Sequence, residues 1–320
     1  MKSPNKFLFL FLMISSTCMV LSSSNWLMTW MGLEINMLGF IPLMFLKETA
    51  NESETAMKYL VPQSLGSTIF IASAVISLYL NELQSLMSIA MCLKLGAAPF
   101  HFWFPPVMAG LSLLPAFMLL TWQKIAPIFA IATFTSTLTS DVLLVASISA
   151  LWGGIAGLNQ TDIRSLLTYS SIAHTGWMLT AVNSDVTVLS IYVMTYILIN
   201  LSIYTTLTSP SSKSHKQLFA THKPINSLLL ATSILSLGGL PPLAGFIMKL
   251  LVIKSTQASL SVLTALIFGA LVSLFYYLSL TFSPLLELAK MQLSKTHISK
   301  SSIMFSLAQV LPLSSLLFFF

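Results

Sequence analysis

The sequence is poor in charge. Only 8% of its 320 residues are Asp, Glu, Lys or Arg, whereas 56% are hydrophobic, and the mean hydropathy is +0.87. Soluble domains usually carry about a quarter charged residues, enough to cover a surface that faces water. This composition excludes an ordinary soluble domain and predicts an all-α, polytopic membrane protein.

Cysteine and nucleotide-binding motifs are also scarce. Cys18 and Cys92 are the only cysteines and share no short spacing, which excludes an iron–sulfur cluster or a cysteine zinc site on this chain. Neither GxGxxG nor GxxxxGK[ST] occurs, so nothing indicates a nucleotide pocket. We therefore expect no cofactor and no metal on the chain itself.

Long hydrophobic runs dominate the sequence. A membrane-spanning helix needs roughly 20 mostly apolar residues. Because the stretches between the runs are short, we expect one membrane domain over 1–320. The first run follows two lysines, as in a signal peptide, but the unbroken series of later runs favours an uncleaved first span. The eleven runs lie near 7–22, 25–46, 57–80, 84–103, 109–135, 140–158, 165–183, 187–208, 226–253, 258–282 and 301–320.

An eleven-helix path sorts the basic residues by side of the membrane. The N-terminus and the even-numbered loops carry 11 of the 15 basic residues, the opposite side carries Lys254 alone, and three lie inside spans. Basic residues stay on the side from which the chain inserts, so this side is predicted to be the matrix or cytoplasm. The net charge of +6 then reflects topology rather than binding of nucleic acid. The 11 residues are Lys2, Lys6, Lys47, Lys58, Arg164, Lys213, Lys216, Lys223, Lys290, Lys295 and Lys300.

Proline and glycine interrupt two of the predicted spans. The fourth contains KLGAAPFHFWFPP with Lys94, and the ninth contains LGGLPPLAGFIMK with Lys249. The two spans are five apart, and two units of five helices have opposite orientations because five is odd. Matching breaks in two halves indicate an inverted-repeat transporter with its site near the midplane. The alternative is a pair of ordinary proline kinks.

Charged side chains inside the predicted spans are the main functional candidates. Each costs roughly 2.5–3.5 kcal/mol at the bilayer centre, so four unpaired ones would cost on the order of 10 kcal/mol. They must pair or reach water. Burial disfavours the charged form of lysine and glutamate alike, and lysine, unlike arginine, can then exchange a proton, which points to a proton relay. The four residues are Glu34, Lys94, Lys124 and Lys249.

The relay interpretation has alternatives for each of these residues. Any of them can form a structural polar contact, and a lysine can extend to the membrane surface. The second possibility applies above all to Lys124, if its long segment consists of two short pieces. His174, in YSSIAHTGWM, suits a proton shuttle, and packing against serine within the bundle explains it equally well. His101 lies two turns beyond Lys94 only if Pro99 does not end the helix.

Five segments, in order, resemble a known family. MGLEIN, KLGAAPFHFWFP, TWQKIAP, NQTDIRSLLTYSSIAHTGWM and LGGLPPLAGFIMK look like the antiporter-like membrane subunits of respiratory complex I. The likeness covers roughly residues 1–255. It implies about eleven transmembrane helices: two inverted five-helix repeats with discontinuous helices, near 1–135 and 140–282, and a C-terminal helix near 301–320.

The resemblance also implies a role for each candidate. Glu34 and Lys94 match the glutamate–lysine pair of the first repeat, and Lys124 matches the bridging lysine. Lys249 matches the terminal lysine, and His174 matches the histidine of the central hydrophilic axis.

The chain would therefore take part in proton translocation within NADH:ubiquinone oxidoreductase of the mitochondrial inner membrane, with its N-terminus in the matrix. Flavin mononucleotide and iron–sulfur clusters would lie on other subunits. Its partners would be other membrane subunits and the lipid bilayer, with no bound NADH or nucleic acid. Two alternatives stay open: a subunit of a separate cation/proton antiporter, and a passive structural subunit.

Overall fold

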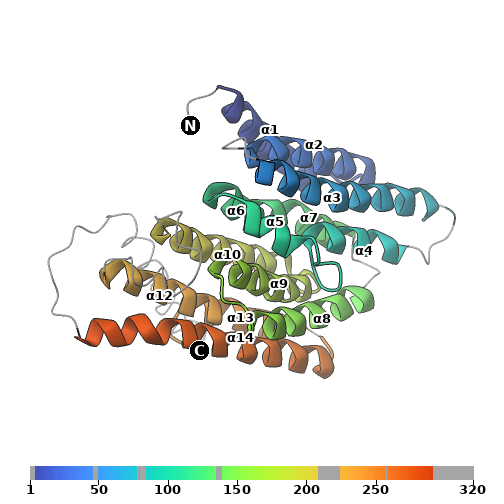
Figure 1. Cartoon of the computed structure of the whole chain (residues 1–320). Coiled ribbons are helices and arrows are strands. Elements are labelled where there is room, and N and C mark those ends of the chain that lie inside the picture. Colours follow the sequence, from blue (N-terminus) through green and yellow to red (C-terminus); the bar gives the residue numbers. More distant parts are fainter. Residues whose placement is uncertain are drawn as a thin grey trace.

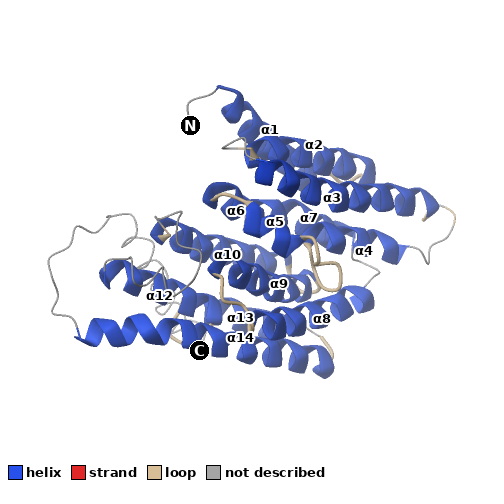
Figure 2. Cartoon of the chain, in the orientation of Figure 1, coloured by secondary structure: helices blue, strands red, loops and turns tan. Residues whose placement is uncertain are grey.

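The computed structural model of the chain describes residues 4–45, 50–77, 79, 84–134, 139–207, 224–256 and 258–290. These residues form helices joined by turns and contain no strand (Figure 2). The helices lie side by side, and helices α1–α7 form one half of the molecule while α8–α14 form the other (Figure 1). The all-α expectation is confirmed for this part of the chain.

The first half contains seven helices. The helix of the fourth predicted span ends at Leu95, before the predicted end of the span. An irregular segment, 96–103, follows, and a separate short helix begins after it. The fifth predicted span is two pieces separated at Thr121. The helices are α1 (Pro4–Ser22), α2 (Trp26–Met44), α3 (Ala50–Ile76), α4 (Gln84–Leu95), α5 (Phe104–Gly110), α6 (Leu113–Leu120) and α7 (Trp122–Phe134).

The second half repeats the pattern of long helices with one break. The ninth predicted span consists of two helices separated at 239–243, and the tenth continues to Lys290. The eleventh span, 301–320, lies outside the described residues. The helices are α8 (Thr139–Gly157), α9 (Ile163–Val182), α10 (Val186–Thr206), α12 (Pro224–Gly238), α13 (Ala244–Ser255) and α14 (Leu260–Lys290).

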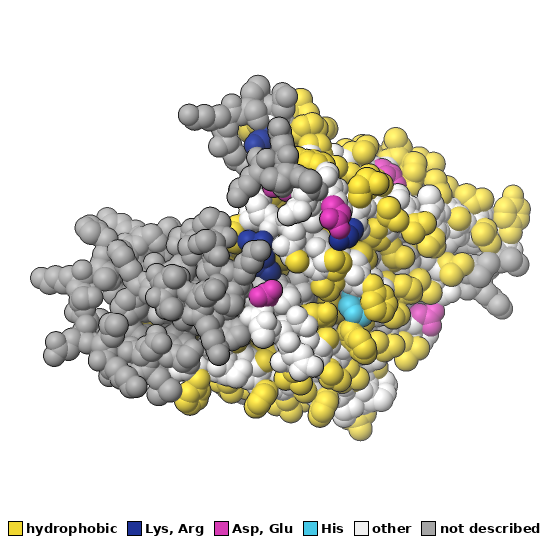
Figure 3. All heavy atoms as spheres, viewed as in Figure 1, with side chains coloured by type: hydrophobic (Ala, Val, Ile, Leu, Met, Phe, Trp, Pro, Cys, Tyr) yellow, Lys and Arg dark blue, Asp and Glu magenta, His cyan; other side chains and the backbone are white. Residues whose placement is uncertain are grey.

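Six helical stretches of the described residues are long and apolar enough to cross a membrane. Large hydrophobic side chains are exposed on their outer surfaces, and Figure 3 shows such side chains over much of one face, with few acidic or basic ones. A hydrophobic exterior of this kind faces lipid rather than water. The six stretches are Trp26–Met44, Asn51–Ile76, Leu113–Thr133, Ser140–Gly157, Val186–Thr206 and Leu260–Phe282.

The backbone of helix α8 lies in close contact with the backbones of α9 and α14. A Cβ added to Gly153 of α8 would lie 2.5 Å from the backbone nitrogen of Ala173 on α9, and one added to Gly269 of α14 would lie 2.4 Å from the Ala150 oxygen. Small residues at such contacts let membrane helices approach closely. Helices α8 and α14 therefore form a tight frame with α9, the helix that carries His174.

Candidate functional site

The first broken helix places Lys94 in the last turn of α4. Gly96, with φ of +67°, ends the helix in a left-handed conformation that favours glycine. Side chains then bind the carbonyls that the break releases: Trp103 Nε1 donates to the Leu93 oxygen at 3.1 Å, and Gln63 Nε2 of α3 donates to the Lys94 oxygen at 2.9 Å. The freed backbone thus faces protein, as membrane helices require.

The second broken helix places Lys249 against the end of its own first half. Helix α12 ends at Gly238, and Gly239 has φ of +85°. The Lys249 ammonium on α13 donates to the carbonyl oxygens of Gly238 at 2.9 Å and Leu237 at 3.3 Å. A cation at the C-terminal end of a helix is stabilised by the helix dipole. The break therefore creates the binding place for the lysine.

Lys124 lies between the two halves of the molecule. Its Nζ donates to the Ser171 carbonyl oxygen of α9 at 2.9 Å and lies 5.3 Å from the ring centre of Tyr196 and 5.7 Å from that of Phe104. The segment is indeed two short pieces, but the side chain is only 3% exposed. This burial excludes extension to the membrane surface for Lys124.

His174 contacts the same interior from the middle of α9. Its Nδ1 lies 2.8 Å from the Tyr192 hydroxyl of α10, and its ring centre lies 5.2 Å from that of Tyr196. The ring interacts with the Leu237 carbonyl, which also binds Lys249, and it feels the charges of both Lys124 and Lys249. His174 therefore lies within electrostatic range of both the central and the terminal lysine.

Glu34 is the least buried of the predicted site residues. It lies partly exposed on α2, and its carboxylate interacts electrostatically with the Lys94 ammonium. The two side chains, both in the described part of the chain, do not form a direct ion pair. The carboxylate therefore acts on the Lys94 ammonium across a gap, without fixing its position.

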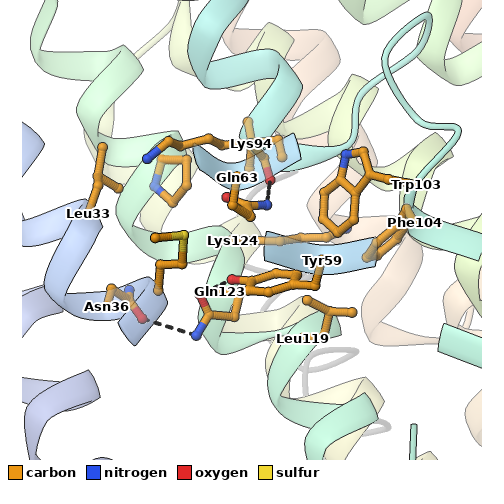
Figure 4. A pocket seen from close by; sticks show the side chains of 13 residues that line it. Leu33, Asn36, Tyr59, Gln63, Lys94, Trp103, Phe104, Leu119, Gln123 and Lys124 are labelled. Atoms are coloured by element: carbon orange, nitrogen blue, oxygen red, sulfur yellow. Dashed lines mark hydrogen bonds between the residues drawn. The ribbon is translucent and has the colours of Figure 1, made fainter. Parts of the chain in front are cut away.

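A small cavity joins the neighbourhoods of Lys94 and Lys124. Its volume open to the centre of a water molecule is about 20 Å³, and Figure 4 shows the side chains around it. About 10–15 Å³ on this measure is enough for one water. Besides apolar side chains, its lining includes the two lysines and four neutral polar residues: Asn36, Tyr59, Gln63 and Gln123.

Comparison with known proteins identifies the family. A family model described as NADH:quinone oxidoreductase/Mrp antiporter, TM, matches residues 23–84 and 74–274. NADH-ubiquinone oxidoreductase chain 2 of Nandinia binotata is 38% identical over 307 residues, covering 90% of this chain and 88% of that protein. The Anopheles gambiae protein of the same name is 39% identical over 297 residues, with coverage of 88% and 86%. The chain belongs to the NADH-ubiquinone oxidoreductase chain 2 family. The resemblance drawn from the five sequence segments is thereby confirmed.

Solved structures share the fold of this chain. Respiratory complex I from Thermus thermophilus with bound Aureothin contains a chain that aligns with a TM-score of 0.84 at 24% identity, covering 96% of this chain and 77% of that one. The Mrp complex from Dietzia contains one with a TM-score of 0.70 at 17% identity, with coverage of 92% and 61%. The antiporter-like fold is therefore established.

The neutral polar residues of this site were not singled out from the sequence. The hydroxyls of Tyr59 and Tyr192 and the amides of Asn36, Gln63 and Gln123 contact the lysines, the histidine or the cavity. Gln123 had a usable signal, since an amide directly before Lys124 in the apolar TWQKIAP needs a buried partner. His101, in contrast, packs between Phe102 and Trp152, with ring centres 4.7 and 5.6 Å away, and does not line the cavity.

Proposed function

We propose that this chain is a core membrane subunit of respiratory complex I, an H⁺-translocating NADH:ubiquinone oxidoreductase, and takes part in moving protons. The observation that carries the proposal is a line of buried basic side chains through the interior of a membrane bundle in the chain 2 family. Buried titratable groups of this kind mark proton relays in pumps and transporters. They are Lys94, Lys124, His174 and Lys249.

The relay begins at Glu34, whose charge favours the protonated form of Lys94. When a change elsewhere in the complex neutralises or moves Glu34, Lys94 releases its proton toward Lys124. His174 then couples Lys124 to Lys249. The separation of Glu34 and Lys94 supports this step, because a direct buried ion pair would resist the change.

The topology that suits this function has eleven spans in two inverted repeats, about 1–135 and 140–282, with a C-terminal helix near 301–320. The break between α4 and α5 and the break between α12 and α13, each beside a buried lysine, support it. The N-terminus faces the matrix side of the mitochondrial inner membrane. Other membrane subunits of the complex are the partners, and flavin mononucleotide and iron–sulfur clusters lie on other subunits, so this chain binds neither NADH nor a redox group.

Substitution of the first lysine tests the relay. In the assembled complex in vesicles, we expect Lys94→Met and Glu34→Gln to lower NADH-driven proton uptake at least severalfold, with normal assembly on a native gel. Lys58→Met is the matched control, because Lys58 is exposed and pairs with Glu54 outside the relay. Unchanged rate and proton-to-electron ratio in both relay variants would remove the proposal. A loss of assembly without a pumping defect in the assembled fraction would instead support a passive structural subunit.

A separate cation/proton antiporter is the second candidate, favoured by the fold shared with the Mrp complex. Purification distinguishes the two. Complex I is supported if flavin, iron–sulfur centres and NADH oxidation activity co-purify with the chain. The antiporter is supported if the purified chain exchanges protons for sodium and none of these co-purify.

A further inference from the structure

Within the described residues, no hydrogen bond joins the side chains of Lys94 and Lys124. In Figure 4 the Lys94 nitrogen lies toward Leu33, away from Trp103. The Lys124 ammonium donates a hydrogen bond to the Ser171 carbonyl oxygen of α9, at 2.9 Å. Both side chains line the 20 Å³ cavity. A proton that passes between these two lysines therefore needs an intermediate group in the cavity.

Two polar atoms of buried residues at the cavity lack a partner. Lys94 and Gln63 are 5% and 7% exposed. Within the described residues, neither Lys94 Nζ nor Gln63 Oε1 forms a hydrogen bond, although Gln63 Nε2 does. Neither atom is among the fully enclosed unpaired side-chain atoms of the described residues, so each borders space that a water molecule can enter. The cavity has room for one water, and a donor and an acceptor on its wall would hold it.

Gln123 is the residue that shapes this cavity from the side of Lys124. Its Nε2 donates to the Asn36 oxygen of α2 at 3.0 Å and contacts Met13 Sδ of α1 at 3.4 Å, and its Oε1 faces the Tyr59 hydroxyl of α3 at 3.4 Å. The long contact to Tyr59 leaves acceptor capacity on Oε1. One amide on α7 thus links three helices and presents an oxygen at the cavity.

We propose that Gln123 is a positioning residue that, with Gln63, holds a water between Lys94 and Lys124 and so closes the gap in the relay. In the transfer, one proton leaves Lys94 Nζ, the water passes one proton on, and Lys124 Nζ gains one after turning from Ser171. The water and both amides end unchanged. This inference rests on the proposed relay, but it concerns neutral residues that the relay itself does not require to titrate.

Substitution of Gln123 in the assembled complex tests the inference. Gln123→Leu keeps most of the volume and removes both polar atoms, so we expect proton uptake to fall about tenfold and the solvent deuterium isotope effect on turnover to rise. Gln123→Asn keeps the amide and should restore at least half of the rate. Gln160→Leu is the matched control, because within the described residues the side-chain amide of Gln160 hydrogen-bonds only to the Ala156 carbonyl near the end of α8. A structure with resolved waters should show density in the cavity that Gln123→Leu removes.

The outcomes separate this inference from the proposed function. If Gln123→Leu leaves rate and isotope effect unchanged while Lys94→Met stops proton uptake, the inference is wrong and the relay stands. If Lys94→Met also has no effect, the proposed function fails. Equal loss in Gln123→Leu and Gln123→Asn, with an unchanged isotope effect, would mean that the amide only packs, and would overturn the inference. Should Gln123→Leu fail to assemble, Gln63→Leu decides by the same measurements.

Discussion

Gly245 offers a test of how the second break positions its lysine. A Cβ on Gly245 would lie 1.6 Å from the Ser236 carbonyl oxygen, whereas real Cβ contacts stay beyond about 3.0 Å. Gly245→Ala must therefore move α13 from the end of α12 by about 1.4 Å. Lys249 lies one turn further along α13, so the same shift takes its Nζ out of hydrogen-bonding reach of the Gly238 oxygen, now at 2.9 Å.

The size of the effect follows from the lost bond. A hydrogen bond made by a charged group contributes about 1.5–3 kcal/mol, and about 1.4 kcal/mol corresponds to a factor of ten in rate. We therefore expect Gly245→Ala to slow NADH-driven proton uptake by vesicles roughly tenfold or more. A native gel measures the assembled fraction, and rates are compared per assembled complex.

A neighbouring glycine supplies the control. The nearest atom to a Cβ on Gly238 would be a side-chain atom of Tyr277, at 3.2 Å, and Gly238→Ala keeps the carbonyl that binds Lys249. We expect this variant to pump nearly normally. Normal proton uptake by assembled Gly245→Ala, or an equal defect in Gly238→Ala, would show that Lys249 does not depend on the contact between the two half-helices.

Two further substitutions probe the middle of the relay. Lys124→Met removes the bond to the Ser171 carbonyl, and we expect proton uptake to fall at least tenfold while Lys58→Met has no effect; equal rates in the two would contradict a relay through α7. Tyr192→Phe removes the hydroxyl 2.8 Å from His174 Nδ1, and we expect a severalfold slower uptake and a changed pH profile. Tyr204→Phe on the same helix, whose hydroxyl forms no hydrogen bond within the described residues, should leave both unchanged, and an identical response of the two variants would argue against a role for His174.

The parts of the site that depend on local sequence could be predicted. Proline and glycine are clustered at the breaks beside Lys94 and Lys249, so both breaks could be predicted from the sequence, whereas the single prolines at 42, 62 and 127 lie inside continuous helices. The cost of a buried charge likewise made Lys124 a candidate without any knowledge of its surroundings, and its function stays a prediction. The family resemblance added the order in which these residues act, which remains a prediction.

The parts that depend on contacts between distant helices could not be predicted. The partner of Lys124 is a backbone carbonyl of Ser171, 47 residues away, and carbonyls leave no mark in a sequence. The neutral residues around the cavity come from α2, α3 and α7, and hydropathy cannot tell which amide faces another amide. The exact end of α4 was also missed, because apolar residues continue beyond Gly96 after the helix has stopped.

The close glycine contacts of α8 limit which helices can move during transport. With less space than one methyl group between α8 and its neighbours α9 and α14, these helices cannot slide like pistons without first separating. We therefore expect these helices to stay fixed during transport, as do α12 and α13, whose contact at Gly245 is closer still. Transport would then proceed by small rearrangements of the lysine side chains between them.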